Sequence, residues 1–344
     1  MIKKKKILLI ILFVIIGAAF CYFFLKIINK GSIIEKTTDG NLCLRDNEIA
    51  DYKIEKIDEY YGETQIVVKD EKSGTDKFSF GIQNTRLSVH PIEIHKCGIY
   101  LIREFNINYA KSEFLPNFNY TLWKYDYTGN STKLITLAER KKEQKLVIYY
   151  STEFRISPQE KYLALIRGSL GSSNYALVIK DLNTLQDVFV LPITEIEKQK
   201  PEMVQDIEFQ TWTKDGRYFW LDTHDGANIL GYIRIDSTDW NVDYLLSPKD
   251  VLGGDALNVE KGLITVHPGN IWFGIADMTQ QEKNERKSKG IGTELYIENL
   301  FTQEKTFVVS TTEPLHYFRP QWLSDTELQY ELPSGEKKVY KIEQ

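Results

Sequence analysis

A phrase of one short strand, a tight polar corner and an aromatic-rich strand recurs five times along this chain. The copies are IEIHKCGIYLIRE, FRISPQEKYLALI, FQTWTKDGRYFWL, ITVHPGNIWFGIA and PQWLSDTELQYEL, with corners that begin at His95, Ser157, Thr213, His267 and Leu323. The intervals between the corners are 62, 56, 54 and 56 residues. A period of this size, with about four strand-like runs in each unit, is typical of β-propeller blades. We therefore predict an all-β propeller, with six blades favoured and five or seven as alternatives.

The unit around Thr213 shows its strand-like runs most clearly. Its expected strands are 207–212, 217–224, 228–236 and 241–246. Asp-Gly pairs that begin at Asp215 and Asp225 favour hairpin turns between the first three strands. The preceding unit is expected to repeat this arrangement with strands 154–157, 161–169, 174–182 and 187–193.

The last two units depart from this pattern. One has expected strands at 262–267, 271–277, 293–300 and 305–311, with the charged segment 281–290 as a solvated loop. The other has only three, at 319–323, 327–332 and 337–343, so its outer edge lacks a partner. Spare strands are expected at 52–61, 64–70 and 77–82. We expect one of them to close the ring against the C-terminal unit.

The N-terminus has the pattern of a membrane anchor. Four lysines precede an apolar run, residues 7–25, that Lys26 and Lys30 follow. As a helix, its 19 residues would span about 28 Å, close to the roughly 30 Å thickness of the hydrocarbon core of a bilayer. The apolar core of a signal peptide is shorter than this run. We predict an uncleaved anchor; cleavage after Ala19 and lipidation of Cys21 are the alternatives. The lysine excess before the run places the first residues in the cytoplasm, at the cell membrane, and the propeller in the periplasm or outside the cell.

This anchor divides the chain into three parts. Residues 1–28 are the cytoplasmic tail and transmembrane helix, 29–42 a polar linker and 43–344 the propeller. The chain has 43 Lys and Arg against 48 Asp and Glu, and six of the lysines lie in the first 30 residues, which leaves 37 basic residues against 48 acidic ones. Nucleic acid and anionic lipid need a basic face, so we expect neither as the ligand of the propeller.

Two cysteines lie outside the apolar run, at positions 43 and 97. In an oxidising compartment Cys43 and Cys97 could form a disulfide. Two cysteines alone do not define a disulfide framework, so a pair of buried free thiols is the alternative.

The corners carry a family resemblance. Ser157-Pro158-Gln159-Glu160-Lys161 keeps Ser, Pro and Lys of the pattern Ser-Pro-Asp-Gly-Lys, and Thr213-Lys214-Asp215-Gly216-Arg217 keeps its Asp-Gly. Over residues 85–344 the chain resembles TolB-type propeller repeats, which also occur in the propeller domain of prolyl-oligopeptidase-like enzymes. The resemblance implies a scaffold that contacts proteins, or that holds a peptide or glycan at the mouth of its channel. The chain differs from TolB in its membrane run and in showing no additional N-terminal α/β domain.

Short catalytic motifs are absent from the sequence. There is no Gly-x-Ser-x-Gly elbow, no phosphate-binding Gly-rich loop with Gly-Lys-Ser/Thr and no His-Glu-x-x-His helix, and we expect no hydrolase domain after the propeller. We therefore predict a membrane-anchored, non-enzymatic scaffold that binds an envelope protein, a peptide or a glycan and uses no cofactor or metal. The alternative is a hydrolase or lyase that acts on a peptide or glycan at the channel mouth.

Three groups of residues are candidates for binding. Asp222, His224 and Asp225 surround a hairpin, where they could act as acid, base or metal ligands, although aspartates also stabilise turns. Asp236, Asp239 and Asp243 surround Trp240 and have the same two interpretations. The third group consists of polar residues on, or at the ends of, the first strands: Arg155, Gln210, His267 and Arg319. If these face the channel they form a partly cationic ring for an acidic peptide or a sugar; otherwise they pair with neighbouring acids.

Overall fold

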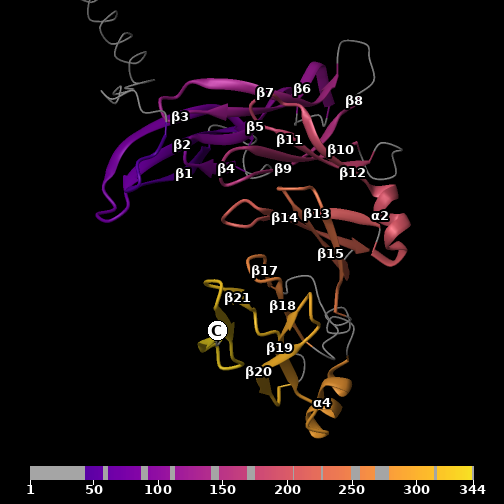
Figure 1. Ribbon diagram of the computed structural model, residues 1–344. Coiled ribbons are helices and arrows are strands. Elements are labelled where there is room, and N and C mark those ends of the chain that lie inside the picture. Colours follow the sequence, from indigo (N-terminus) through magenta and orange to yellow (C-terminus); the bar gives the residue numbers. More distant parts are fainter. Residues whose placement is uncertain are drawn as a thin grey trace, which may run out of the picture. The chain divides into compact units, whose positions relative to one another are not determined.

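The structure is a computed structural model, drawn as a ribbon in Figure 1. It divides into two compact units, Met1–Val147 and Ile148–Gln344. It describes residues 43–56, 61–86, 92–108, 113–140, 147–168, 175–203, 205–225, 228–248, 256–267, 279–313 and 316–342. In both units the described residues are mostly antiparallel β-strands, which confirms the all-β prediction.

The first unit contains two sheets. One has the order β1-β2-β3 and is built from β1 (Glu48–Lys56), β2 (Tyr61–Asp70) and β3 (Asp76–Arg86). The other, β4-β5-β6-β7-β8, comprises β4 (Ile92–His95), β5 (Gly98–Asn108), β6 (Glu113–Tyr125), β7 (Ser131–Arg140) and β8 (Val147–Ile148), which reaches into the second unit. Alternate residues of β2, Ile66 and Val68, pack with Ile99 and Leu101 of β5. This period-two pattern buries one face of each sheet in a shared core.

The second unit contains four further sheets. The first, in the order β12-β11-β10-β9, comprises β9 (Tyr150–Ile156), β10 (Tyr162–Arg167), β11 (Ala176–Asp181) and β12 (Asp187–Pro192), followed by α2 (Ile193–Gln199) and the short 3-10 helix η2 (Pro201–Met203). The second comprises β13 (Asp206–Trp212), β14 (Tyr218–Asp225), β15 (Asn228–Asp236) and β16 (Val242–Leu246).

The remaining sheets follow in sequence order. The third comprises β17 (Leu257–Asn258), β18 (Leu263–Val266), β19 (Thr293–Asn299) and β20 (Lys305–Thr311), with helix α4 (Gln280–Ser288) before β19. The fourth comprises β21 (Gln321–Trp322), β22 (Glu327–Glu331) and β23 (Lys337–Lys341). The described part of the chain thus holds six sheets. A closed ring of six blades stays a prediction.

Apolar clusters lie between successive sheets of the second unit. Ile179 of β11 and Phe209 of β13 belong to one cluster. Two further clusters connect the later sheets in the same way: Trp220, Tyr232, Ile264 and Val266 in one, and Leu295, Ile297, Phe318 and Leu328 in the other. Each of these sheets buries apolar side chains against its neighbour in the chain, as the repeat pattern predicts.

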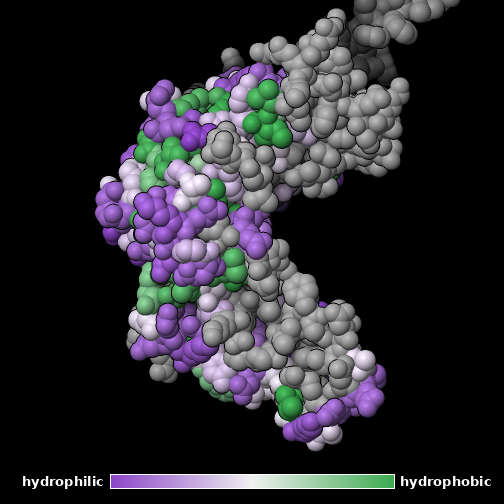
Figure 2. Space-filling view, turned by 90° about the vertical axis from the view of Figure 1, so that its right-hand side faces the viewer, coloured by the Kyte–Doolittle hydropathy of each residue, from purple (hydrophilic) through white to green (hydrophobic). Residues whose placement is uncertain are grey.

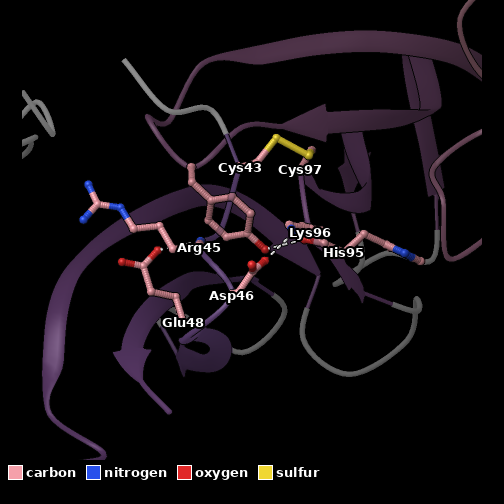
Figure 3. Close-up of a disulfide and its surroundings, with 8 residues drawn as sticks. Cys43, Arg45, Asp46, Glu48, His95, Lys96 and Cys97 are labelled. Atoms are coloured by element: carbon pink, nitrogen blue, oxygen red, sulfur yellow. Dashed lines mark hydrogen bonds and ion pairs between the residues drawn. A yellow bond between two sulfur atoms is a disulfide. The ribbon is translucent and has the colours of Figure 1, made fainter. Parts of the chain in front are cut away.

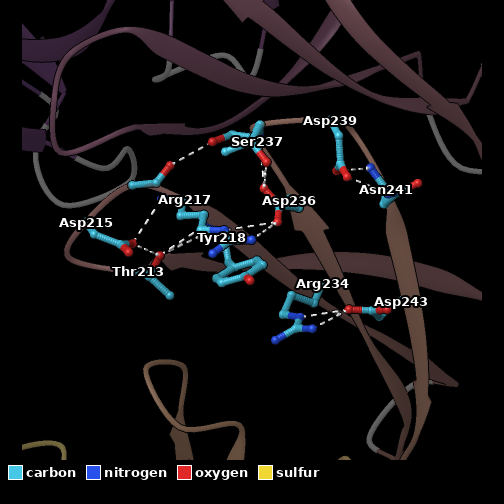
Figure 4. Close-up of polar contacts among 12 residues, drawn as sticks. Thr213, Asp215, Arg217, Tyr218, Arg234, Asp236, Ser237, Asp239, Asn241 and Asp243 are labelled. Carbon is cyan, nitrogen blue, oxygen red and sulfur yellow. Dashed lines mark hydrogen bonds and ion pairs between the residues drawn. The ribbon is translucent and has the colours of Figure 1, made fainter.

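The recurring corner has a clear structural role. In one corner the Thr213 hydroxyl accepts a hydrogen bond from the backbone amide of Tyr218 at 2.9 Å and donates one to Asp215 at 2.7 Å (Figure 4). The Ser157 hydroxyl accepts the equivalent bond from Tyr162, also at 2.9 Å. A hydroxyl residue at this position therefore stabilises the turn between β9 and β10 and the turn between β13 and β14.

The aspartates around Trp240 also stabilise turns and strands. Asp236 accepts a hydrogen bond from the backbone amide of Thr238 at 2.9 Å. It also accepts one from Nη2 of the Arg217 guanidinium at 2.9 Å. Asp239 accepts from Asn241, and Asp243 pairs with Arg234 across β15 and β16, as the dashed lines in Figure 4 show. Asp236 and Asp239 thus stabilise the turn after β15, and Asp243 stabilises the pairing of β15 with β16.

The expected strand order around His267 is wrong. Strand β18 was expected to be the first strand of its sheet, but it is the second. It pairs with β17 on one side and with β19 on the other. The corner lies instead at Asn258. Its side-chain oxygen accepts hydrogen bonds from the backbone amides of Glu260 and Lys261, and its backbone carbonyl accepts one from the amide of Gly262. Asparagine can make these contacts without a hydroxyl, which concealed the corner in the sequence. The expected strand 271–277 lies outside the described residues.

The charged segment 281–290 is a helix for most of its length, not a loop as we expected. Helix α4 covers Gln280–Ser288, and Lys289 lies 2.6 Å from Glu285, four residues earlier. Glutamine, glutamate, lysine and arginine have high helix propensity, and residues 281–289 contain no glycine or proline. The high charge of this segment suggested a solvated loop, whereas the helix propensity of its residues favours the observed helix.

A disulfide joins Cys43 and Cys97 in the first unit (Figure 3). Cys43 precedes β1, and Cys97 lies in the turn between β4 and β5. Beside the disulfide, the amide of Leu44 donates to the carbonyl of Lys96 at 2.7 Å, and the Lys96 ammonium lies 2.6 Å from Asp46. Together these contacts fix the segment before β1 to the β4–β5 turn.

Within the described residues, no helix has both the length and the apolar character needed to cross a membrane. The predicted anchor, 7–25, and the linker, 29–42, lie outside those residues. On the face shown in Figure 2, hydrophilic and hydrophobic residues are interspersed.

Candidate functional site

Polar side chains gather on one face of β13, in the second unit. Asp206, Glu208 and Gln210 alternate along this strand with the buried residues Ile207 and Phe209. Successive side chains of a strand point to opposite faces, so the three polar residues share the face away from the core. This face is the starting point of the candidate site.

Strand β14 adds two residues to the same face. Its Asp222 is paired in register with Glu208, and His224 is paired with Asp206. Directly opposite residues of an antiparallel pair have side chains on the same side of the sheet. The Gln210 amide donates a hydrogen bond to Asp222 Oδ2 at 2.9 Å, and His224 Nε2 lies 3.9 Å from Glu208 Oε2.

Asp222 is the most buried member of this group. It is only 4% exposed, and its other oxygen, Oδ1, is buried without a hydrogen-bond partner among the described residues. Burial and, to a lesser extent, the nearby Glu208 carboxylate raise the pKa of Asp222 to about 6, although Gln210 and His224 act in the opposite direction.

Strand β9 of the preceding sheet brings a second carboxyl group and a guanidinium. Arg155 donates from Nε to the carbonyl of Gln210 at 3.1 Å and from Nη1 to the carbonyl of Phe154 at 2.9 Å, which ties β9 to β13. Its Nη2 lies 3.4 Å from Glu153. Burial raises the pKa of Glu153 to about 7 despite the opposing charge of Arg155. The carboxylates of Glu208 and Asp222 also raise this pKa.

A tyrosine lies at the edge of the group. The buried Tyr175 donates its hydroxyl hydrogen bond to Asp206 Oδ1. Burial, followed by this bond, raises the pKa of Tyr175 above its usual range. The phenol therefore stays protonated and holds Asp206 in place.

The structure brings together four of the predicted residues from two separate hypotheses. Arg155 and Gln210 were predicted to line a channel, and Asp222 and His224 to surround a hairpin, yet all four belong to this one group. Asp225 is the last residue of β14, paired with Asn228.

The other two predicted residues lie elsewhere in the second unit. His267 directly follows β18 and is fully buried. Its ring centroid lies 5.0 Å from that of Tyr317 and 5.9 Å from that of Phe318. Arg319 is exposed and lies 3.6 Å from Glu331. A ligand-binding role for either stays a prediction.

Sequence reasoning missed Glu153, Glu208 and Asp206. The signal was present as alternation: Glu153 and Arg155 are two residues apart, as are Asp206, Glu208 and Gln210. Polar residues at every second position of a strand indicate a polar face. Alternation was applied to Arg155 and Gln210 but not to the acidic residues on the same strands, so this face was only partly predicted.

No family model matches the sequence, and no curated protein matches it. Solved structures do show similarity. TolB from Acinetobacter baumannii is 14% identical, with a TM-score of 0.29, over 85% of this chain and 79% of its own. Oligogalacturonate lyase from Vibrio parahaemolyticus is 10% identical, with a TM-score of 0.45, over 81% of this chain and 73% of its own. Both are β-propellers.

Acylaminoacyl peptidase from Pyrococcus horikoshii is 13% identical, with a TM-score of 0.40 over 73% of this chain. This chain spans 37% of the length of that peptidase. The prediction of a non-enzymatic chain is corrected by these matches, because a peptidase and a lyase stand among the similar structures. The absence of short motifs was a poor ground for excluding catalysis, since strands distant in sequence can assemble a site. The matches assign neither activity to this chain.

Proposed function

We propose that this chain is a hydrolase or lyase that acts on a peptide or a glycan. The observation that carries the proposal is the convergence of Glu153, on β9, with Glu208, Asp222 and His224, which share one face of β13 and β14. Asp222 is buried and Glu153 is partly buried, and they lie on neighbouring sheets. Such a concentration of ionisable groups is costly for folding and is typical of catalytic sites.

The chemistry needs an acid and a base in one place. In hydrolysis a base activates water and an acid protonates the leaving group; in elimination a base removes a proton next to a carbonyl. The partly buried Glu153 suits the acid, and Asp222 and His224 on β14 of the neighbouring sheet offer a base. Arg155 is a positioning residue, because its guanidinium donates to backbone carbonyls of β9 and β13 and holds Glu153 nearby.

We also propose that residues 7–25 anchor the chain in the cell membrane, with the propeller outside the cytoplasm. The lysines before the apolar run and its length support this topology. Protease added to intact spheroplasts should then digest the propeller and spare only the N-terminal tail. Protection of the whole chain until the cells are lysed would reject the proposed topology.

Catalysis can be tested with the substrate classes named by the similar enzymes, N-acylated peptides and oligogalacturonates, together with neutral oligosaccharides. The wild-type chain should cleave one class, and Glu153→Gln and Asp222→Asn should each lower kcat at least 100-fold, since acid and base groups contribute about 10²–10⁴-fold. Asp243→Asn, in the outer strand of the same sheet, is the matched control and should retain full activity.

Loss of activity must be separated from loss of fold. Circular dichroism of each variant should match that of the wild type. Equal kcat in the wild type and both site variants, or cleavage of no substrate by the folded wild type, would reject the proposed function.

A further inference from the structure

One buried carboxylate oxygen on β14 has no hydrogen-bond partner among the residues that the structure describes. Asp222 is 4% exposed, and its Oδ2 accepts from Gln210, whereas Oδ1 is buried without a hydrogen bond among the described residues. Leaving a buried carboxylate oxygen without a hydrogen bond destabilises the folded state. Native proteins retain such a group where something else satisfies it.

Two further donor atoms lie close to Asp222. One ligand atom from each of Glu208, Asp222 and His224 lies within 4.8 Å of the other two. Ligand atoms on a tetrahedral cation bound at about 2.0–2.2 Å are about 3.4 Å apart. The Glu208 side chain is 62% exposed, so it has the freedom to move the remaining distance.

The local charge favours a cation. Four carboxyl groups lie on β9, β13 and β14, those of Glu153, Asp206, Glu208 and Asp222. The Arg155 guanidinium forms an ion pair with one of them, Glu153. A divalent ion between β13 and β14 would offset this excess of negative charge and satisfy Asp222 Oδ1 at the same time.

The donor set selects the kind of cation. One imidazole nitrogen with two carboxylates suits a borderline transition-metal ion such as Zn²⁺, whereas Ca²⁺ and Mg²⁺ prefer oxygen ligands only. Three protein ligands leave at least one coordination position open. This arrangement is typical of catalytic rather than structural zinc sites.

We propose that Glu208, Asp222 and His224 bind one transition-metal dication, with Zn²⁺ as its representative. The inference deepens the proposed function, on whose site it rests. When bound, the ion would polarise a substrate carbonyl or a water molecule at its open position. Asp222 and His224 then serve as ligands, and Glu153 on the neighbouring strand stays available for proton transfer.

The test is calorimetric titration of Zn²⁺ into the full-length chain in mild detergent, after chelator treatment. The wild type should bind one Zn²⁺ that an excess of Ca²⁺ does not displace. Glu208→Gln, Asp222→Asn and His224→Gln should each weaken binding at least tenfold, since loss of even an outer-shell partner costs about 10–100-fold. Asp243→Asn, whose carboxylate pairs with Arg234 away from this group, should bind as the wild type does.

Glu208→Gln keeps the test decisive if the buried Asp222 variant fails to fold, because the Glu208 side chain is mostly exposed. Zn²⁺ should also raise the Tm of the wild type and leave that of Glu208→Gln nearly unchanged. Absence of Zn²⁺ binding by the folded wild type, equal affinity in Glu208→Gln and His224→Gln, or displacement by Ca²⁺ would overturn the inference.

Two outcomes separate this inference from the proposed function. A chain that cleaves its substrate undiminished after chelation and binds no Zn²⁺ would overturn the metal site and leave the enzymatic proposal standing. Specific Zn²⁺ binding without cleavage of any substrate would support the metal site and reject the enzymatic proposal.

Discussion

At the scale of single residues, Glu160 occupies a corner position that suits glycine. Its φ is +53°, close to the +65° of Gly216 at the corresponding place in the next sheet. The left-handed region costs a residue with a Cβ roughly 1–2 kcal/mol, and glycine avoids this cost. We expect Glu160→Gly to be more stable than Glu160→Ala by about 1 kcal/mol in urea unfolding.

The alanine variant is the matched control, because both substitutions remove the same side chain and differ only in the Cβ. The reverse change should be harmful: in Gly216→Ala the new Cβ would lie 1.8 Å from the Gln159 side chain and the φ would be strained. Equal stability of Glu160→Gly and Glu160→Ala would show that the corner is not strained at this residue.

The candidate site shows which residues a sequence can reveal. Asp222 and His224 stand next to a visible Asp-Gly turn, so a local pattern was sufficient to find them. Glu153 is 69 residues before Asp222 and approaches it only because β9 and β13 are neighbours. Whether two strands of different sheets lie side by side depends on tertiary packing, which no local pattern reports.

At the scale of elements, the Arg155 side chain connects two sheets. It donates to carbonyls on β9 and β13 and lies beside Glu153. Each hydrogen bond from a charged group contributes about 1.5–3 kcal/mol. We expect Arg155→Met to lower the free energy of unfolding of the second unit by about 3 kcal/mol in a denaturant titration.

Lys341→Met is the control for that substitution. Lys341 is exposed and pairs with Glu327 on the neighbouring strand, and exposed pairs contribute about 0–1 kcal/mol. Similar losses in Arg155→Met and Lys341→Met would mean that Arg155 does not hold the two sheets together.

The hairpin from β14 to β15 should be sensitive to acid. Burial acts to raise the pKa of Asp236, but Arg217 and Thr238 outweigh it and lower this pKa to about 2. A carboxyl group with a depressed folded-state pKa stabilises the fold above its unfolded value of about 3.9, and the contribution disappears as the pH falls through 2. Asp236→Asn should therefore be less stable than the wild type at pH 7.

Unfolding curves of both proteins between pH 7 and pH 2 check this prediction. The two free energies should differ most above pH 4 and converge near pH 2. A difference that stays constant over the whole range would indicate a loss of packing instead of a loss of charge.

Strands were more predictable than their order. The run 228–236 coincides with β15, and 207–212 begins one residue inside β13, because turn residues mark both ends of each strand. The order in the next sheet was mistaken, since the two-residue strand β17 has no hydrophobic pattern of its own. Short edge strands form through pairing with a neighbour, which a sequence pattern of two residues cannot show.

At the scale of the whole molecule, the two units differ in how they are stabilised. The disulfide Cys43–Cys97, with a sequence separation of 54, lies in the first unit, and no second disulfide occurs among the described residues. Closing a loop of this length removes unfolded-state entropy worth about 4 kcal/mol. We expect a reductant to lower the stability of the first unit and to leave that of the second nearly unchanged.

Tryptophan fluorescence distinguishes the two transitions. One of the six tryptophans, Trp123, lies in the first unit, and the other five follow residue 148. Reduction should therefore shift part of the far-UV circular dichroism transition to lower temperature and barely move the fluorescence transition. A Cys43→Ser, Cys97→Ser variant should reproduce the reduced protein without reductant. Equal shifts of both signals would mean that the chain unfolds as one cooperative body.

The global features of the sequence support broader conclusions than its local motifs do. The repeat period predicted an array of small antiparallel sheets, and the described residues form six. Ring closure, the blade count and the membrane anchor stay predictions. Ring closure and the blade count depend on how distant segments meet, and the anchor depends on residues 1–42. A repeat period of about 55 residues contains no information on either question.

The bond between Arg155 and the carbonyl of Gln210 joins two different copies of the repeat. Duplicating one copy during evolution would therefore multiply sheets without multiplying the approach of Glu153 to Asp222. Inserting a copy between the two would separate Glu153 from Asp222 and abolish the site while leaving every sheet intact. The ancestry of this chain is thus constrained at one junction between repeats, and that junction is the place where related sequences should tolerate no rearrangement.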